Sequence, residues 1–223
     1  MKPETKSSKD STLYSYFRSS TSYRLRIGLN LKRVTYNTVP VNLREGEHLQ
    51  PQFRAINPQG LVPALSLPSG RTLSQSMAAL EYLEETVPTP SFLPGDTSQR
   101  ARIRELANII AIDIHPINNL RVLKYLSNNL NISEDDKNAW IKHWIYEGFE
   151  VLENHLQEFS QWGKYTCGSQ VTLADICLIP QVYNAERFGC DMSRFPRIRD
   201  VTAACMELSA FADARPENQP DAL

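Results

Sequence analysis

The pattern of hydrophobic and polar positions differs between two parts of the chain. In the first 90 residues, short apolar runs of strand length alternate with segments in which apolar residues recur every three or four positions, as on one face of a helix. The expected elements are strand, helix, strand, helix, two short strands and a helix: Thr12–Phe17, Ser20–Lys32, Thr35–Val41, His48–Ile56, Ala64–Leu67, Thr72–Leu73 and a helix that Ser76 caps. A βαβ unit followed by a hairpin and a helix predicts a small α/β domain built on a mixed sheet.

After a proline-rich connection, Val87–Gly95, strand signals give way to long helical patterns. A helix is expected from Asp96 to about Leu130. It should be kinked at Pro116, because a proline ring removes one backbone hydrogen bond and crowds the carbonyl four residues earlier. Its buried stripe has helical spacing and consists of Ile103, Leu106, Ile110, Ile114 and Ile117.

Three more helices are expected in the second part of the chain. They run from Glu134 to Phe159, onward from Thr172, and from Pro196 to about Ser209. Thr172 opens the sequence TLAD, in which Asp175 stands at the spacing of a capping box. The expected organisation is a disordered tail at 1–10, an α/β domain at 11–87, a linker at 88–95, an all-helical domain at 96–214 and a polar tail at 215–223.

Composition and charge narrow the classes of partner. The 223 residues are 41% hydrophobic and 22% charged, which is ordinary for a globular protein. Basic residues number 24 and acidic residues 25, so the net charge of −1 gives no field that attracts nucleic acid or an anionic membrane. No apolar run approaches the ~20 residues of a membrane span, and the N-terminal MKPETKSSKD lacks the apolar core of a secretion signal. We therefore expect a cytoplasmic protein without a nucleic-acid or membrane partner.

The four cysteines all lie late in the chain, at Cys167, Cys177, Cys190 and Cys205. They form no C-x-x-C pair and have no cluster of histidines nearby. This pattern predicts reduced, structural thiols and no metal site.

Candidate chemistry begins at the turn between the first strand and the first helix. Ser19, Ser20 and Thr21 bring three hydroxyl groups to a helix N-terminus, where unpaired backbone N–H groups and the helix dipole favour an anion. A thiolate would be stabilised there, as a cysteine at a helix N-terminus is. The run contains no cysteine, so the thiol would have to come from a bound cofactor. The alternative is that Ser19 or Ser20 only caps the helix.

Two further segments of the α/β domain could bind a ligand. In NPQGLVPAL, a cis bond between Val62 and Pro63 would turn the Val62 N–H and C=O outward to pair with an extended peptide; otherwise Pro63 only marks an element boundary. Gln75 and Ser76 stand where a strand meets a helix. They could hold a carboxylate there, and the simpler role for Ser76 is a helix cap.

The helical part contributes a polar segment, DIHPINNLRVL. His115 and Asn119 are four residues apart and would share one helical face beside the proline kink, although a single helical histidine is often only structural. Arg18 and Arg187 are either surface charges or, if they face one cleft, a pair suited to a substrate with two carboxylates.

The order of these motifs resembles one family closely, the zeta-class glutathione transferases of the maleylacetoacetate isomerase type. The resemblance extends from Leu13 to Pro220. The segments that carry it are YSYFRSSTSYRLRIGLNLK (Tyr14–Lys32), NPQGLVPAL, QSMAALEYLEETVPTP (Gln75–Pro90), DIHPINNLRVL and TLADICLIPQVYNAERF (Thr172–Phe188). It implies a thioredoxin-like α/β N-terminal domain, an all-α C-terminal domain, a homodimer, and glutathione bound between the two domains.

The resemblance also implies roles for individual residues. Ser19, Ser20 and Thr21 match the turn that faces the glutathione sulfur, and Arg18 and Arg187 match contacts to the substrate carboxylates. Val62 would pair with the cysteinyl backbone of glutathione, and Gln75 and Ser76 would hold its γ-glutamyl end. The full set of positions that match glutathione contacts outside the turn is His48, Val62, Pro63, Gln75, Ser76, His115, Asn119 and Arg121.

The implied reaction is the cis–trans isomerisation of maleylacetoacetate to fumarylacetoacetate, a step of tyrosine and phenylalanine catabolism. Thiolate addition makes the double bond single, rotation follows, and elimination restores a trans alkene. Thr21 departs from the many members with cysteine there and also occurs in glutathione-dependent maleylpyruvate isomerases, so maleylpyruvate is an alternative substrate. A broader glutathione transferase or haloacid dehalogenase also stays open and, from another class, so does a non-catalytic adaptor on the same fold.

Overall fold

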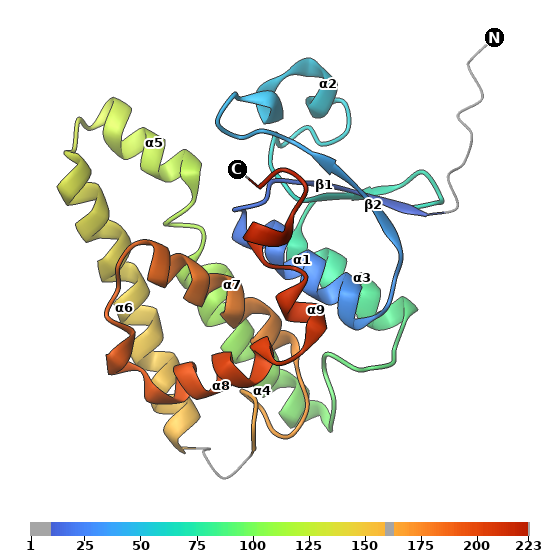
Figure 1. The fold of residues 1–223 in the computed structure, drawn as a ribbon, viewed down its shortest axis with the longest axis vertical. Helices are drawn as coiled ribbons and strands as arrows, with labels where there is room; N and C mark the ends of the chain where they lie inside the picture. The colour runs from blue at the N-terminus through green and yellow to red at the C-terminus, as the bar shows by residue number, and fades with distance from the viewer. Residues whose placement is uncertain (1–9, 159–162, 223) are drawn as a thin grey trace. The chain divides into compact units, whose positions relative to one another are not determined.

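A computed structural model describes residues 10–158 and 163–222 (Figure 1). The chain forms two compact units: Met1–Pro90 together with Ser209–Leu223, and Ser91–Leu208. Residues 1–9 of the expected N-terminal tail, Phe159 at the expected end of a helix, and Leu223 lie outside the described residues.

The first unit is built on a mixed sheet of four strands. These are β1 (Ser11–Ser15), β2 (Tyr36–Pro40), β3 (Ala64–Ser66) and β4 (Thr72–Leu73), in the order β2-β1-β3-β4. Between β1 and β2 the chain crosses over through α1 (Ser20–Leu31), and such a crossover allows the two strands to pair in parallel. The pairs β1–β3 and β3–β4 are antiparallel, and α1 packs against α3 (Ser76–Thr86). The α/β domain with a mixed sheet is confirmed.

Two local expectations for this unit are wrong. The segment His48–Ile56 is not one helix but the 3-10 turn η1 (Glu47–Leu49) followed by the short helix α2 (Pro51–Arg54). Gln50 is extended (φ −71°, ψ 150°) because Pro51 excludes the helical conformation from the residue before it. Ser76 does not cap α3 but is its first residue; the N-cap is Gln75, whose side chain makes no capping bond.

The second unit consists of helices. Their bounds are α4 Thr97–Asn108, the π-helix η2 Ile109–Ile114, α5 Leu120–Asn129, α6 Glu134–Glu158, α7 Leu173–Arg187, the 3-10 turn η4 Met192–Arg194 and α8 Pro196–Met206. The capping box expected at the start of α7 is confirmed. The buried Asp175 carboxylate accepts hydrogen bonds from the backbone N–H of Thr172 (2.7 Å) and of Thr166 (2.9 Å).

The helix expected from Asp96 to Leu130 is broken rather than only kinked. The α-helix widens into η2, a turn follows at Pro116, and α5 starts afresh behind Asn119. Pro116 cannot donate the backbone hydrogen bond that would continue the helix. η2 lies close to α6, where Gly148 leaves the space: a Cβ at this glycine would lie 2.4 Å from Ile114 Cδ1.

The expected end of the helical domain at 214 and the polar tail after it do not match the structure. The segment from Ser209 onward, with α9 (Ser209–Ala212) and the 3-10 turn η5 (Pro216–Asn218), belongs to the first unit, and α9 lies beside α1 (Figure 1). Although the composition of this segment is polar, Ala214 and Pro216 are buried. The segment is therefore packed into the first unit.

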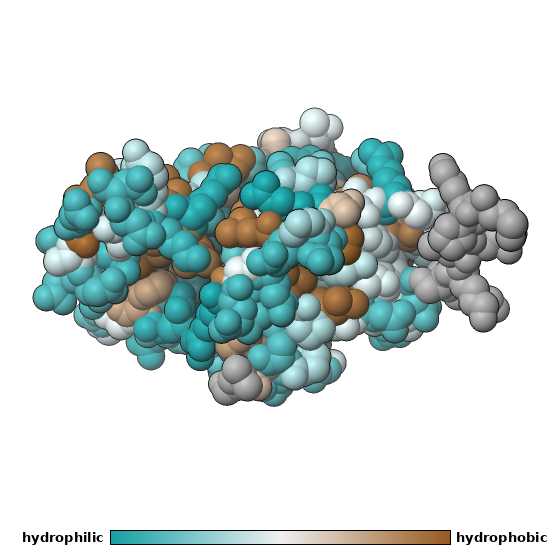
Figure 2. Space-filling view, turned by 90° about the horizontal axis from the view of Figure 1, so that it is seen from above, coloured by the Kyte–Doolittle hydropathy of each residue, from teal (hydrophilic) through white to brown (hydrophobic). Residues whose placement is uncertain are grey.

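No helix within residues 10–158 and 163–222 has the length and apolar character that crossing a membrane requires. On the face drawn in Figure 2, hydrophobic side chains are interspersed among hydrophilic ones. The large hydrophobic residues with exposed surface are Val39, Leu49, Ile112, Leu120, Tyr125, Leu130 and Val151.

Candidate functional site

The turn between β1 and α1 presents the serine and threonine hydroxyl groups at the start of a helix. Ser19 is the N-cap of α1, and its Oγ accepts a hydrogen bond from the Ser22 N–H at 3.2 Å. The Ser19 N–H in turn donates to the carbonyl oxygen of Tyr16 at 3.0 Å. The first turn of α1 contains no acidic residue. Its N–H groups and the helix dipole therefore face a position that favours negative charge.

The hydroxyl groups of this turn form a chain that ends at Val62. Thr21 Oγ1 donates to the Val62 carbonyl oxygen at 3.1 Å, and Ser19 Oγ lies 2.9 Å from Thr21 Oγ1. Because Thr21 donates its only hydroxyl proton to Val62, Ser19 Oγ is the donor in the hydrogen bond between the two hydroxyl groups. The sequence predicted the turn and Val62 separately, and the structure brings them together. Ser20, the first residue of α1, is buried next to them.

The loop before Val62 is shaped by Asn57, whose role the sequence reasoning missed. The buried Asn57 side chain donates from Nδ2 to the Leu61 carbonyl (2.7 Å) and accepts from the Gln59 N–H (3.1 Å). Gly60 adopts φ +62°, and a Cβ there would lie 2.9 Å from the His48 carbonyl oxygen. His48 is itself buried. The Val62–Pro63 peptide bond is cis, one of the two alternatives that the sequence left open.

Gln75 joins the same loop from the other side. Its side-chain Nε2 donates to Gln59 Oε1 at 2.9 Å, which explains why it does not cap α3. Ser76 is buried at the start of that helix. The first unit therefore connects three of the predicted positions through hydrogen bonds: the hydroxyl turn to Val62, and the Val62 loop to Gln75.

The candidates on the second unit have a different local structure from the one expected. His115 and Asn119 do not share a helical face, because a turn separates η2 from α5. Asn119 is extended (φ −68°, ψ 146°) and caps α5, its side-chain oxygen accepting from the Arg121 N–H at 3.2 Å. His115 is half-buried and Arg121 is exposed.

The two arginines expected to bind carboxylates belong to different units. Arg18 is half-buried, with its guanidinium carbon 4.9 Å from the centre of the Phe17 ring. Arg187, at the end of α7, is exposed; its guanidinium lies 4.1 Å from the centre of the Phe188 ring and donates to Asn184 Oδ1 at 3.5 Å. Their convergence on one substrate stays a prediction.

The cysteines are free thiols, and all four lie in the second unit. Burial raises the pKa of the Cys167 thiol to about 11, and burial also raises the pKa of Cys190. These groups are therefore protonated near neutral pH and are poor nucleophiles.

Comparisons with known proteins agree with the geometry. A family model described as "Glutathione S-transferase, N-terminal domain" matches residues 18–86. The chain is 48% identical over 212 residues to the probable maleylacetoacetate isomerase of Vibrio cholerae, an alignment that covers 94% of this chain and 97% of that protein. It is 49% identical over 209 residues to the maleylpyruvate isomerase of a Ralstonia species, covering 94% and 98%. A crystal structure of maleylacetoacetate isomerase from Methylobacterium extorquens, with bound malonate and glutathione, has a TM-score of 0.92 at 36% identity and covers 95% of this chain and 99% of that one.

Proposed function

Since the chain belongs to the zeta-class glutathione transferases of the maleylacetoacetate isomerase type, we propose that it catalyses the glutathione-dependent cis–trans isomerisation of maleylacetoacetate to fumarylacetoacetate. The observation that carries the proposal is the hydroxyl-lined N-terminus of α1, which favours an anion in a chain where burial raises the pKa of the Cys167 and Cys190 thiols. The thioredoxin-like fold of the first unit and the helical second unit are those of the family.

The residues of the first unit fit glutathione. The Val62 carbonyl, in the loop before β3, accepts a hydrogen bond from the Thr21 side chain, so this backbone faces the hydroxyl turn. Gln75 and the buried Ser76, at the N-terminus of α3, suit a carboxylate. We assign Val62, Pro63, Gln75, Ser76 and His48 to its binding, together with His115, Asn119 and Arg121 of the second unit.

Bound glutathione supplies the thiolate that adds to the substrate double bond and leaves it again. We assign stabilisation of negative charge on sulfur to the N–H groups of the first helical turn and to the Ser20 hydroxyl. Ser19 would turn its proton from Thr21 Oγ1 to the bound sulfur, and Thr21, which donates to the Val62 carbonyl, would orient Ser19. Arg18 and Arg187 would hold the two substrate carboxylates and the charge that develops between them. The bound malonate in the Methylobacterium relative is a dicarboxylate, which supports a diacid substrate.

The test is an isomerase assay on dialysed, thiol-free protein with maleylacetoacetate, and with maleylpyruvate in parallel. We expect no turnover until glutathione is added, faster turnover of maleylacetoacetate, and full recovery of the thiol when the reaction ends. Turnover at the same rate without glutathione would overturn the proposal, and faster turnover of maleylpyruvate would replace the substrate. An adaptor would turn over neither diacid.

We also propose that the protein is a homodimer located in the cytoplasm. The free thiols are consistent with a reducing compartment. Light scattering during size-exclusion chromatography should give twice the chain mass of 25.4 kDa, and cell fractionation should place the protein with cytoplasmic markers.

A further inference from the structure

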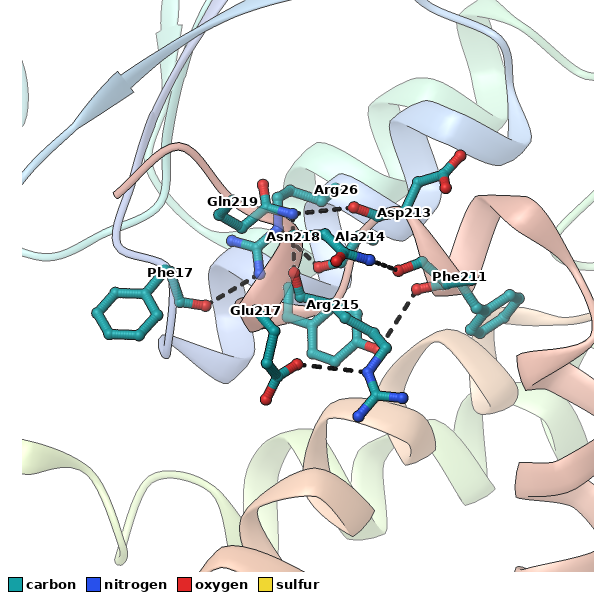
Figure 3. Close-up of polar contacts among 11 residues, drawn as sticks. Phe17, Arg26, Phe211, Asp213, Ala214, Arg215, Glu217, Asn218 and Gln219 are labelled. Atoms are coloured by element: carbon teal, nitrogen blue, oxygen red, sulfur yellow. Dashed lines mark hydrogen bonds and ion pairs between the residues drawn. The ribbon is translucent and has the colours of Figure 1, made fainter. Parts of the chain in front are cut away.

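Arg26 is a buried arginine in the middle of α1 that no part of the proposed reaction uses. Its side chain is fully buried, and each of its nitrogens donates a hydrogen bond. Figure 3 shows Arg26 beside Phe17 and Ala214. Nη2 donates to the Phe17 carbonyl at 3.0 Å, Nη1 to Ser15 Oγ at 3.1 Å, and Nε to the Ala214 carbonyl at 3.0 Å. One guanidinium thus joins the end of β1 to the C-terminal segment.

Asp221 binds the backbone N–H of Phe17, whose carbonyl is bound by Arg26. Its Oδ2 accepts from the Phe17 N–H at 2.9 Å, across 204 positions of sequence. The second oxygen, Oδ1, is buried and has no hydrogen-bond partner among the described residues. Burial lowers the pKa of Arg26 to about 10, and the charge of Asp221 acts against that shift. The N–H and the C=O of Phe17 are therefore held by two side chains of opposite charge.

Hydrogen bonds hold the C-terminal segment in a defined conformation and attach it to α1. Gln219 Nε2 donates to the carbonyls of Asp213 and Arg215, both at 2.9 Å, which closes the segment on itself. Tyr23 and Asn30 of α1 donate to carbonyls of Phe211 (3.4 Å) and Ala210 (3.1 Å). Such a segment can place Asp221 at a fixed point.

Phe17 connects the C-terminal segment to the hydroxyl turn. It directly precedes Arg18 and Ser19, so its peptide orientation sets where the hydroxyl turn begins. Its ring belongs to a buried hydrophobic cluster that also contains Val62, and Ala222 packs against that cluster. The C-terminal segment therefore bonds to the residue two positions before Ser19 and packs against the cluster that contains Val62.

We propose that Asp221 and Arg26 are positioning residues that fix the Phe17 backbone and, through it, the hydroxyl turn that activates the thiol. The proposal rests on the proposed function only for the thiol; the fixing of the turn is a property of the protein alone. Neither residue touches the reacting atoms in this scheme.

The test compares Asp221→Ala and Asp221→Asn with the matched surface change Asp213→Asn, whose side chain is exposed on the same segment. Without ligand, hydrogen exchange of the Phe17 amide should accelerate in Asp221→Ala, with shifts in the amide resonances of Ser20 to Ser22. In the glutathione complex, thiolate absorbance should titrate at higher pH, and kcat should fall by about 10- to 100-fold, as expected for a displaced reacting group. KM for the diacid should change little.

Asp221→Asn keeps an acceptor for the Phe17 N–H but loses the charge, so it should restore most of the amide protection and part of kcat. Asp213→Asn should match the wild type throughout. A stable Asp221→Asn and a folded Asp221→Ala with wild-type kcat, thiolate titration and amide shifts would overturn the proposal. If the wild type neither binds glutathione nor isomerises, the proposed function fails, while the amide measurements still test the positioning role.

Discussion

The hydroxyl turn of the first unit and the polar segment of the second are held in place by partners at different separations along the sequence. The turn depends on partners remote in sequence: Val62 for its hydroxyl groups, and Arg26 and Asp221 for the peptide before it. The polar segment depends on its neighbours and on α6 of the same unit. Asn119 caps the helix that follows it and Pro116 ends the one before. Trp140 Nε1 donates to the Ile117 carbonyl at 3.2 Å, and Asn118 Nδ2 donates to the Ile141 carbonyl at 3.4 Å. We therefore expect the turn to lose its geometry when residues of the C-terminal segment change, and the polar segment to lose its geometry when its own residues or those of α6 change.

Arg26→Met tests the remote side of this comparison and should have the largest effect. Removing the guanidinium leaves the Phe17 and Ala214 carbonyls and Ser15 Oγ without their buried donor. It also removes the positive charge of Arg26, whose pKa the Asp221 carboxylate raises. Losing one member of a buried charged network costs about 3–5 kcal/mol, so the free energy of unfolding in urea should fall by that amount. Arg71→Met, at an exposed position, should change it by less than about 0.5 kcal/mol. A loss below about 1 kcal/mol for Arg26→Met would mean that the remote contacts do not hold the turn.

Ser19→Ala with Ser20→Ala separates the chemistry of the turn from its anchoring. The double variant should lower turnover by roughly tenfold to a thousandfold, as the loss of a charge-stabilising hydrogen bond does. Stability should fall by only about 1 kcal/mol through the lost cap. Steady-state kinetics and urea unfolding measure the two effects, with the exposed Ser69→Ala as control. Wild-type turnover with unchanged thiolate absorbance would show that the turn only caps α1.

Arg18→Lys and Arg187→Lys ask whether both units contribute to one substrate. Lysine keeps the charge and loses the bidentate fork, so each change should lower kcat/KM for the diacid by about one to two powers of ten. Glutathione affinity should stay nearly constant, since its contacts are assigned elsewhere. Arg71→Lys and Arg199→Lys, both exposed, are the matched controls. If both variants retain wild-type efficiency, the arginines are surface charges and the diacid contact lies elsewhere.

Asn119→Ala tests the local side and should have the smallest effect on stability. Loss of an N-cap costs about 1 kcal/mol, and Asn128→Ala within the same helix should stabilise it slightly because alanine is the better helix former. Urea unfolding of the two variants should therefore move in opposite directions. A loss at Asn119 as large as that of Arg26→Met would erase the difference between the two regions.

The same difference explains what could be predicted from the sequence. The strands, α1, the capping box at Thr172 and Asp175, and the serine cap all follow from residues within a few positions of one another. At Pro116 the sequence predicted a kink from the missing backbone donor, whereas the helix is broken there. The apolar stripe continues across the break, so the periodicity favoured one continuous helix.

The site residues that were missed have remote partners. Arg26 has the appearance of a solvated charge on an amphipathic helix, and Asp221 that of a tail residue. Arg26 gains its role from Phe17, 9 positions away, and from Ala214, 188 positions away. Asp221 gains its role from Phe17, 204 positions away. Asn57 is a partial exception. Asparagine before a proline and a glycine is a turn signal, and its two bonds to Gln59 and Leu61 are of that local kind.

Because the C-terminal segment belongs to the first unit, it also constrains the order in which the two units can be completed during synthesis. Ribosomes add roughly 5–20 residues per second, and domains tend to fold in the order in which they emerge. The helical unit Ser91–Leu208 lies between the two parts of the α/β unit, so α1 is complete on the order of ten seconds before Ala214 and Asp221 exist. During that interval Arg26 has no carbonyl or carboxylate from the C-terminal segment. The unit that begins first is therefore the last to be completed.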